Sequence, residues 1–116
     1  MIILVIGAGH TGAQVLRQLK KNPQIKLLTL DPRNEPFAIQ QGIIEAVDFT
    51  EALTPLTLEF ILEQAKPDLV LLASATEDMG LGTAQGMDVL AQALRDELAA
   101  IAKVPVIEVA RTARRR

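Results

Sequence analysis

The segment MIILVIGAGHTGAQVL, residues 1–16, decides the fold. An apolar run at residues 2–6 leads into three glycines with the spacing Gly-x-Gly-x-x-Gly, and apolar residues then recur with helical periodicity. This order is typical of a buried strand, a tight glycine turn and a helix. The segment therefore predicts a strand–turn–helix unit at the start of an α/β domain.

Similar apolar runs recur along the chain. They cover residues 2–6, 26–30, 42–47, 68–73 and 105–109. Most of them are nearly continuous in apolar residues, as strands buried on both faces require. Segments of helical character separate them, at residues 10–21, 34–41, 56–65 and 87–101. The alternation predicts a single Rossmann-like, doubly wound parallel sheet of about five strands, in the order 3-2-1-4-5.

Composition limits the class of protein. The chain has 116 residues, 49% of them hydrophobic, and no cysteine. No run reaches the roughly 18 apolar residues of a membrane span. Nothing at the N-terminus has the pattern of a signal peptide. We therefore expect a cytoplasmic protein that is not inserted in a membrane and has no disulfides.

The net charge of −2 is unevenly distributed along the chain. Residues 111–116 hold four of the twelve basic side chains, so residues 1–110 carry eight basic against fourteen acidic ones. An acidic body without Trp or Tyr lacks the basic stripe and the stacking surface of nucleic-acid-binding proteins. We expect one folded domain over 1–110, a basic C-terminal tail over 111–116 and no nucleic-acid partner.

The three glycines predict a phosphate-binding turn. Gly7 permits a sharp turn out of the strand, Gly9 lets the backbone approach a phosphate, and Gly12 lets the helix pack closely. The helix N-terminus beyond Gly9 presents N–H groups and a partial positive charge, which suit a pyrophosphate. Residues 1–110 are thus predicted to form a dinucleotide-binding domain.

Asp31, at the end of the second predicted strand, indicates which dinucleotide binds. A carboxylate there can accept hydrogen bonds from both ribose hydroxyls and repels a 2′-phosphate, which favours NAD over NADP. The alternative is that Asp31 only caps the segment before Pro32. Arg33 has three interpretations: it holds a 2′-phosphate, stacks on adenine, or is a solvated loop charge.

The remaining candidate contacts lie in the loops around the predicted cleft. His10 either donates to the phosphates or is a bystander. Ala73, Ser74 and Thr76 follow the fourth predicted strand, where small or hydroxylated residues leave room for ribose and can bond it. Asp48 has two interpretations: it lies near the adenine, or it is an ordinary Asp at the end of a strand. The predicted cofactor contacts are Gly7, Gly9, His10, Thr11, Gly12, Asp31, Arg33, Asp48, Ala73, Ser74 and Thr76.

A further glycine-rich stretch follows. Gly80, Gly82 and Gly86 favour either a mobile lid or a second phosphate contact, and a simple long loop is the alternative. The sequence indicates no catalytic residue and no metal ligand.

In order along the chain, VIGAGHTG, LLTLD, GIIEAVDFT, LVLLASATED and VPVIEVAR resemble the nucleotide-binding domain that regulates potassium conductance and Trk-type potassium uptake. The resemblance covers residues 1–111. It implies a regulatory domain that binds NAD(H) or an adenine nucleotide, with a membrane transporter or another protein as its partner. The oligomeric state is left open, with a homodimer among the options.

Three functions compete at this point. The first is an NAD(H)-binding sensor module. The second is an NAD-dependent oxidoreductase or its cofactor-binding domain. Hydride transfer needs a substrate site and usually a general acid or base, and the only histidine of the chain, His10, lies in the phosphate loop. The third is a methyltransferase, a fold that normally continues beyond the fifth strand. The sensor module is the preferred hypothesis.

Overall fold

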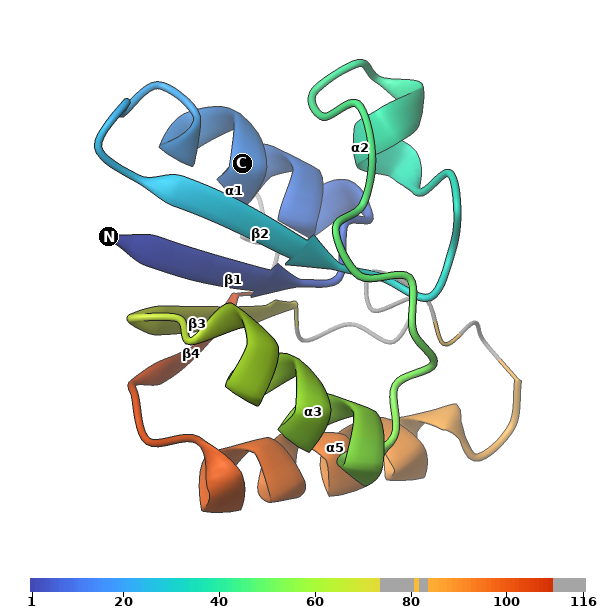
Figure 1. The fold of residues 1–116 in the computed structure, drawn as a ribbon. Helices are drawn as coiled ribbons and strands as arrows, with labels where there is room; N and C mark the ends of the chain where they lie inside the picture. The colour runs from blue at the N-terminus through green and yellow to red at the C-terminus, as the bar shows by residue number, and fades with distance from the viewer. Residues whose placement is uncertain (74–80, 82–83, 110–116) are drawn as a thin grey trace, which may run out of the picture.

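A parallel sheet forms the centre of the molecule. The computed structural model describes residues 1–73, 81 and 84–109, coloured in Figure 1. Within this part of the chain the strands are β1 (Ile2–Ile6), β2 (Lys26–Leu30), β3 (Leu69–Ala73) and β4 (Val106–Val109). They form a four-stranded sheet in the order β2-β1-β3-β4, and every pair is parallel. The carboxyl ends of all described strands therefore meet at one edge.

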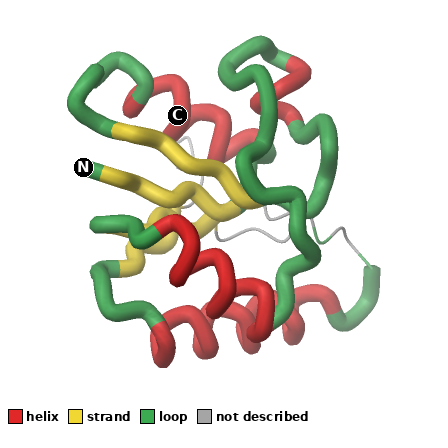
Figure 2. The backbone as a smooth tube through the Cα atoms, viewed as in Figure 1, coloured by secondary structure: helices red, strands yellow, loops and turns green. Residues whose placement is uncertain are grey.

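Helices cover both faces of this sheet. They are α1 (His10–Leu19), α2 (Phe37–Gln40), α3 (Pro55–Ala65) and α5 (Met87–Ile101). The first two lie on one face and the last two on the other, as Figures 1 and 2 show. The predicted α/β architecture with helices on both faces is confirmed. Among the described residues, no helix has the length and apolarity that crossing a membrane requires.

Strand β1 is buried on both sides, as its continuous apolar run predicts. Ile3 and Val5 belong to the core cluster under α1 and α2. Leu4 and Ile6 belong to the larger cluster under α3 and α5. Alternate side chains of one strand thus supply two hydrophobic layers, which fixes the register of the central strand.

The prediction of a strand over residues 42–47 is wrong, and with it the prediction of five strands in the order 3-2-1-4-5. This segment contains turns, and only one isolated parallel bridge, between Leu30 and Phe49, follows it. Ile43 and Ile44 both pack into the cluster on the α1 side. A strand would point consecutive side chains to opposite faces. The two isoleucines therefore both pack in the hydrophobic cluster beside α1.

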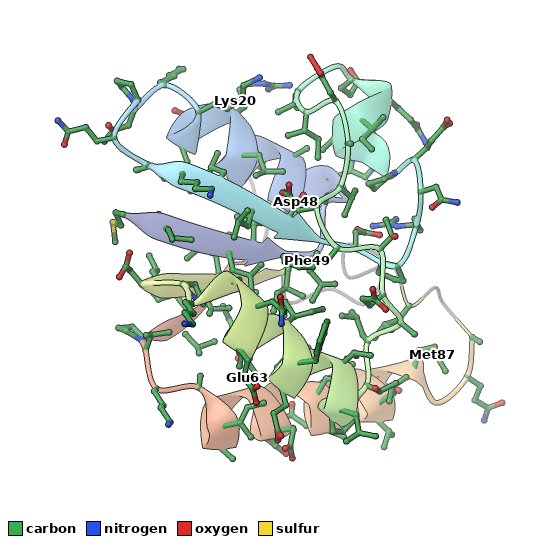
Figure 3. The ribbon with its side chains drawn as sticks, viewed as in Figure 1. Lys20, Asp48, Phe49, Glu63 and Met87 are labelled. Atoms are coloured by element: carbon green, nitrogen blue, oxygen red, sulfur yellow. The ribbon has the colours of Figure 1, made fainter. Side chains whose placement is uncertain are left out.

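Asp48 and Phe49 hydrogen-bond to the edge of β2 where the missing strand was expected. The Asp48 carboxylate accepts from Thr29 N–H at 2.8 Å, and Phe49 N–H donates to the Thr29 carbonyl at 2.9 Å. Asp31 N–H in turn donates to the Phe49 carbonyl at 3.0 Å. Figures 2 and 3 show this segment passing the end of β2 on its way from α2 to α3. The edge of β2 is covered here by a loop.

The helices agree with their predicted positions, with one shift in the buried face of α5. Leu90, Leu94 and Leu98 recur at a helical spacing that would place them on one face of α5. Leu94 and Leu98 are buried, whereas Leu90 is 37% exposed and Ala91 takes the buried position in the preceding turn. Ala91 therefore belongs to the core cluster on the α3 and α5 side.

Candidate functional site

The turn after β1 has the backbone geometry that the glycine pattern predicts. Gly7 has φ +95°, a left-handed conformation that a side chain disfavours. Its N–H donates to the Leu30 carbonyl at 2.8 Å, so the pairing of β1 with β2 extends into the turn. Gly7 therefore ends the strand and redirects the chain while its amide remains bonded.

Gly12 places the first turn of α1 directly against this glycine turn. A Cβ atom at position 12 would lie 1.8 Å from the Gly7 carbonyl oxygen and 2.8 Å from its carbon. No side chain fits at such distances. The prediction that Gly12 allows close packing of the helix is confirmed, and its contact is the backbone of Gly7.

The N-terminus of α1 lies at the carboxyl edge of the sheet. Gly9 is the N-cap and its carbonyl accepts from Ala13 N–H at 2.8 Å. Gly9 has no side chain to cap the first-turn N–H groups, which have no acceptor inside a helix. Thr11 and Gly12 are buried in this turn, and His10 is exposed. The positive end of the helix dipole therefore lies beside the glycine turn.

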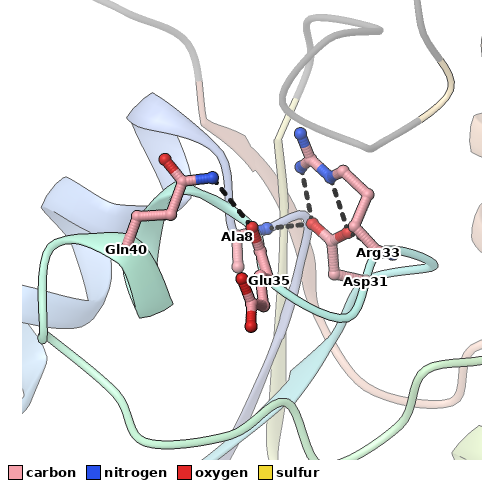
Figure 4. Close-up of polar contacts among 5 residues, drawn as sticks. All are labelled: Ala8, Asp31, Arg33, Glu35 and Gln40. Carbon is pink, nitrogen blue, oxygen red and sulfur yellow. Dashed lines mark hydrogen bonds and ion pairs between the residues drawn. The ribbon is translucent and has the colours of Figure 1, made fainter.

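Asp31 binds the glycine turn from the end of β2. Its side chain has 0% exposure, and Oδ2 accepts from Ala8 N–H at 2.8 Å. Oδ1 accepts from Arg33 N–H at 2.9 Å. The Arg33 guanidinium completes the set, from Nε to Oδ1 at 2.8 Å and from Nη2 to Oδ2 at 2.7 Å. Figure 4 shows the carboxylate between Ala8 and the guanidinium.

This geometry gives Asp31 and Arg33 a shared role. The carboxylate fixes the Ala8 amide and is paired with a cation two residues later, so it does more than cap the segment before Pro32. Its negative charge is balanced by Arg33, whose side chain is 38% exposed. Contact between Asp31 and a ribose stays a prediction, and in this state the guanidinium occupies the same oxygens.

Helix α2 is attached to the other side of the glycine turn. Ala38 N–H donates to the Ala8 carbonyl at 3.0 Å. The His10 ring packs on Phe37, with ring centroids 3.9 Å apart and planes tilted by 32°. Gln40 Nε2 closes the preceding loop by donating to the Glu35 carbonyl at 3.0 Å, as drawn in Figure 4. His10 is thus held at the opening of α1 by an aromatic neighbour.

The other predicted contacts divide into three groups. Asp48 bonds the N–H and the hydroxyl of Thr29 on the outer edge of β2, so its carboxylate already has a structural role. Ala73 ends β3, the strand beside β1, and is buried. Ser74 and Thr76 lie outside the described residues. Contact of these four with a cofactor therefore stays a prediction.

The proposed lid falls mostly outside the described part of the chain, since Gly80 and Gly82 belong to the residues left undescribed. Gly86 is the N-cap of α5 and has φ +90°. Its left-handed conformation explains a glycine at this position without a ligand.

Sequence reasoning missed the importance of Ala8 and Phe37. Ala8 acts through its amide, bonded to Asp31 on one side and Ala38 on the other. Backbone hydrogen bonds of this kind do not depend on the type of residue, so the sequence does not indicate them. Phe37 was only weakly indicated by the sequence. It is an aromatic residue in a short helical segment, and such a side chain needs a surface to pack on.

A groove of about 790 Å³ lies elsewhere, between the C-terminal ends of α3 and α5. It is lined by Glu59, Leu62, Glu63, Lys66, Pro67, Ala100, Ile101, Lys103 and Val104. The residues that follow these two helices lead into the amino ends of β3 and β4. Ligands of parallel α/β sheets bind at the carboxyl ends. The glycine turn, and not this groove, is therefore the candidate ligand site.

The described residues hold no cluster of His, Cys, Asp or Glu suited to a metal ion. Comparison with models of protein families, with curated proteins and with solved structures gave no match. The class of the protein thus follows from its own geometry: an α/β protein with a parallel sheet and a hydrogen-bonded glycine turn at the carboxyl edge of that sheet.

Proposed function

We propose that this chain binds an adenine dinucleotide, NAD(H), as a regulatory ligand. The observation that carries the proposal is the glycine turn itself. Gly7 is left-handed, Gly12 has room for no side chain, and Asp31 is buried against the amide between the two. A Rossmann-like dinucleotide site uses a tight turn at the first glycine, close helix packing at the third glycine and an acidic residue at the end of the second strand.

In this proposal each part of the dinucleotide contacts a different part of the site. The pyrophosphate binds at the N-terminus of α1, over Gly9 and beside His10 and Thr11. The adenosine ribose lies at the end of β2, where Asp31 and Arg33 are placed. Ala73 lines the cleft beside β1, with Ser74 and Thr76 as further ribose contacts.

The regulatory role is preferred over a hydride-transfer enzyme. An oxidoreductase needs a substrate site and usually a general acid or base. The only histidine, His10, packs on Phe37 at the phosphate end of the site. Steady NADH production from a hydroxy acid or an alcohol would favour the oxidoreductase alternative.

The same proposal extends to the setting of the protein. The resemblance to potassium-regulating domains suggests a cytoplasmic module that reports NAD(H) binding to a membrane transporter or another protein. The proposal leaves the oligomeric state open, with a homodimer among the options, and assigns no role to the basic tail at 111–116.

Calorimetric titration of the full chain with NAD, NADH, NADP, ATP and S-adenosylmethionine tests the function. We expect NAD or NADH to bind and S-adenosylmethionine not to bind. In Gly9→Val, two methyl groups would block the phosphate from N–H groups worth about 1.5–3 kcal/mol each. Loss of two such bonds should lower the affinity more than about a hundredfold.

A thermal melt of Gly9→Val without ligand is the control, because Gly9 is buried in the turn. The affinity loss counts only if the variant is folded at the titration temperature. A folded Gly9→Val that binds NAD like the unmodified chain would show that the glycines serve only as a turn, and the proposed function would be wrong.

A further inference from the structure

The Asp31 carboxylate is fully engaged in the ligand-free chain. A carboxylate offers about four acceptor positions on its two oxygens. Here Oδ1 accepts from the backbone N–H and from Nε of Arg33. Oδ2 accepts from Ala8 N–H and from Nη2 of Arg33. A ribose hydroxyl can reach either oxygen only if one of these donors leaves.

The four donors are not equally able to leave. The two backbone N–H groups belong to the glycine turn and to the turn after β2, so losing them means moving the chain. The guanidinium is carried on a flexible side chain that is 38% exposed, beside a carboxylate with 0% exposure. Arg33 is therefore the donor that can be exchanged.

The shape of the guanidinium also indicates what can replace it. Nε and Nη2 present two parallel N–H donors to the two carboxylate oxygens, at 2.8 and 2.7 Å. A ribose with free 2′ and 3′ hydroxyls presents two neighbouring O–H donors to a carboxylate in a similar manner. A 2′-phosphate in place of the hydroxyl removes one donor and adds negative charge beside Asp31.

We propose that Arg33 is a built-in competitor of the ligand: it occupies the ribose-binding oxygens of Asp31 in the free chain and is released when a nucleotide with a free 2′,3′-diol binds. This inference rests on the proposed function and adds a residue that sets affinity and specificity. The observed affinity is lowered by the fraction of molecules in which Arg33 covers Asp31.

The test compares Arg33→Met with Arg17→Met by titration with NAD and with NADP. Methionine keeps most of the aliphatic stem and removes the guanidinium. Arg17→Met is the matched control, since it removes the same charge from an exposed position in the last turn of α1, far from the glycine turn. Arg33→Lys keeps the charge but cannot form the bidentate pair.

We expect Arg33→Met to bind NAD about tenfold more tightly than Arg17→Met, as suits a bidentate pair that is partly exposed. Arg33→Lys should lie between the two. NADP affinity should not rise with NAD affinity, because the uncovered carboxylate repels the 2′-phosphate. Asp31 keeps both backbone partners in these variants, and a melt of each checks that it is folded. If Arg33→Met is unfolded, the rise in Arg33→Lys alone decides the question.

Other outcomes overturn the inference in distinguishable ways. If the unmodified chain and Arg17→Met bind NAD, and Arg33→Met binds it equally or less tightly, Arg33 is no competitor. If Arg33→Met gains equally for NAD and NADP, the gain does not arise at the diol. If no folded variant binds any dinucleotide, the proposed function itself is wrong, and this inference is wrong with it.

Discussion

Positions 12 and 42 both favour glycine, for two different physical reasons. A Cβ at position 12 would meet the Gly7 carbonyl oxygen at 1.8 Å, and that oxygen belongs to backbone that cannot turn away. Gly42 has φ +73°, and a Cβ added there would have nothing within 4 Å. Gly12 is therefore required by a close approach, and Gly42 only by its backbone conformation.

Alanine at each position should separate these two costs. Gly42→Ala should lower the free energy of unfolding by about 1–2 kcal/mol, the cost of a left-handed non-glycine residue. Gly12→Ala must move α1 away from the turn, and we expect a loss of more than about 3 kcal/mol. Urea unfolding measures both. Equal losses would mean that the contact of α1 with Gly7 relaxes easily.

The edge of β2 is the element in which the structure departs most from the sequence-based prediction. The run GIIEAV has the composition of a strand, and nothing in it signals that Ile43 and Ile44 pack on the same side. What decides the outcome is tertiary: the space beside α1, and the Asp48 carboxylate bonded to Thr29 N–H. Local propensity cannot report either of them.

Asp48 should therefore matter for stability more than for binding. Asp48→Ala leaves the Thr29 N–H without its carboxylate partner, and the free energy of unfolding should fall by about 1–2 kcal/mol. Asp48→Asn keeps an acceptor oxygen and should restore part of the loss. NAD affinity, measured by calorimetry, should change less than about twofold. A loss of affinity above about tenfold in a stable Asp48→Ala protein would instead place Asp48 at the adenine.

Elsewhere the sequence was informative because its signals were local. The strand and helix positions and the roles of Gly7 and Gly12 followed from apolar runs and glycine spacing, and the structure confirms them. Burial on both faces holds for β1, whereas in β4 no residue is buried and Ile107 is 50% exposed. The carboxylate of Asp31 was found from its position at the end of the second predicted strand. The ion pair between Asp31 and Arg33 was not predicted. It depends on the side-chain rotamer of Arg33, and a rotamer leaves no periodic pattern in the sequence.

At the scale of the whole molecule, the two ends of the sheet offer two different surfaces. The glycine turn lies at the carboxyl ends of the strands, and the groove that includes Glu63 and Lys103 lies at the amino ends. The length of the strands separates them. A change in one surface should therefore have little effect on binding at the other.

Lys103→Glu tests this separation. It reverses a charge in the groove, and we expect the NAD dissociation constant to change less than about twofold. NAD at about a hundred times that constant should add about 2.7 kcal/mol to the free energy of unfolding of both proteins. Calorimetry and urea unfolding measure the two quantities. Loss of NAD binding in folded Lys103→Glu would identify the groove as the ligand site.

The backbone of Ala8 has a thermodynamic consequence for any ligand of the turn. Its N–H is bonded to Asp31 and its carbonyl to Ala38 N–H, so strand β2 and helix α2 both hold it in place before a ligand arrives. A loop already ordered loses little conformational entropy on association, and more of the contact energy becomes affinity. On the protein side, Arg33 gains rotamers when it is released, which adds a favourable entropy. Ligand binding would thus increase the conformational freedom of the Arg33 side chain, while the backbone of Ala8 keeps its hydrogen bonds.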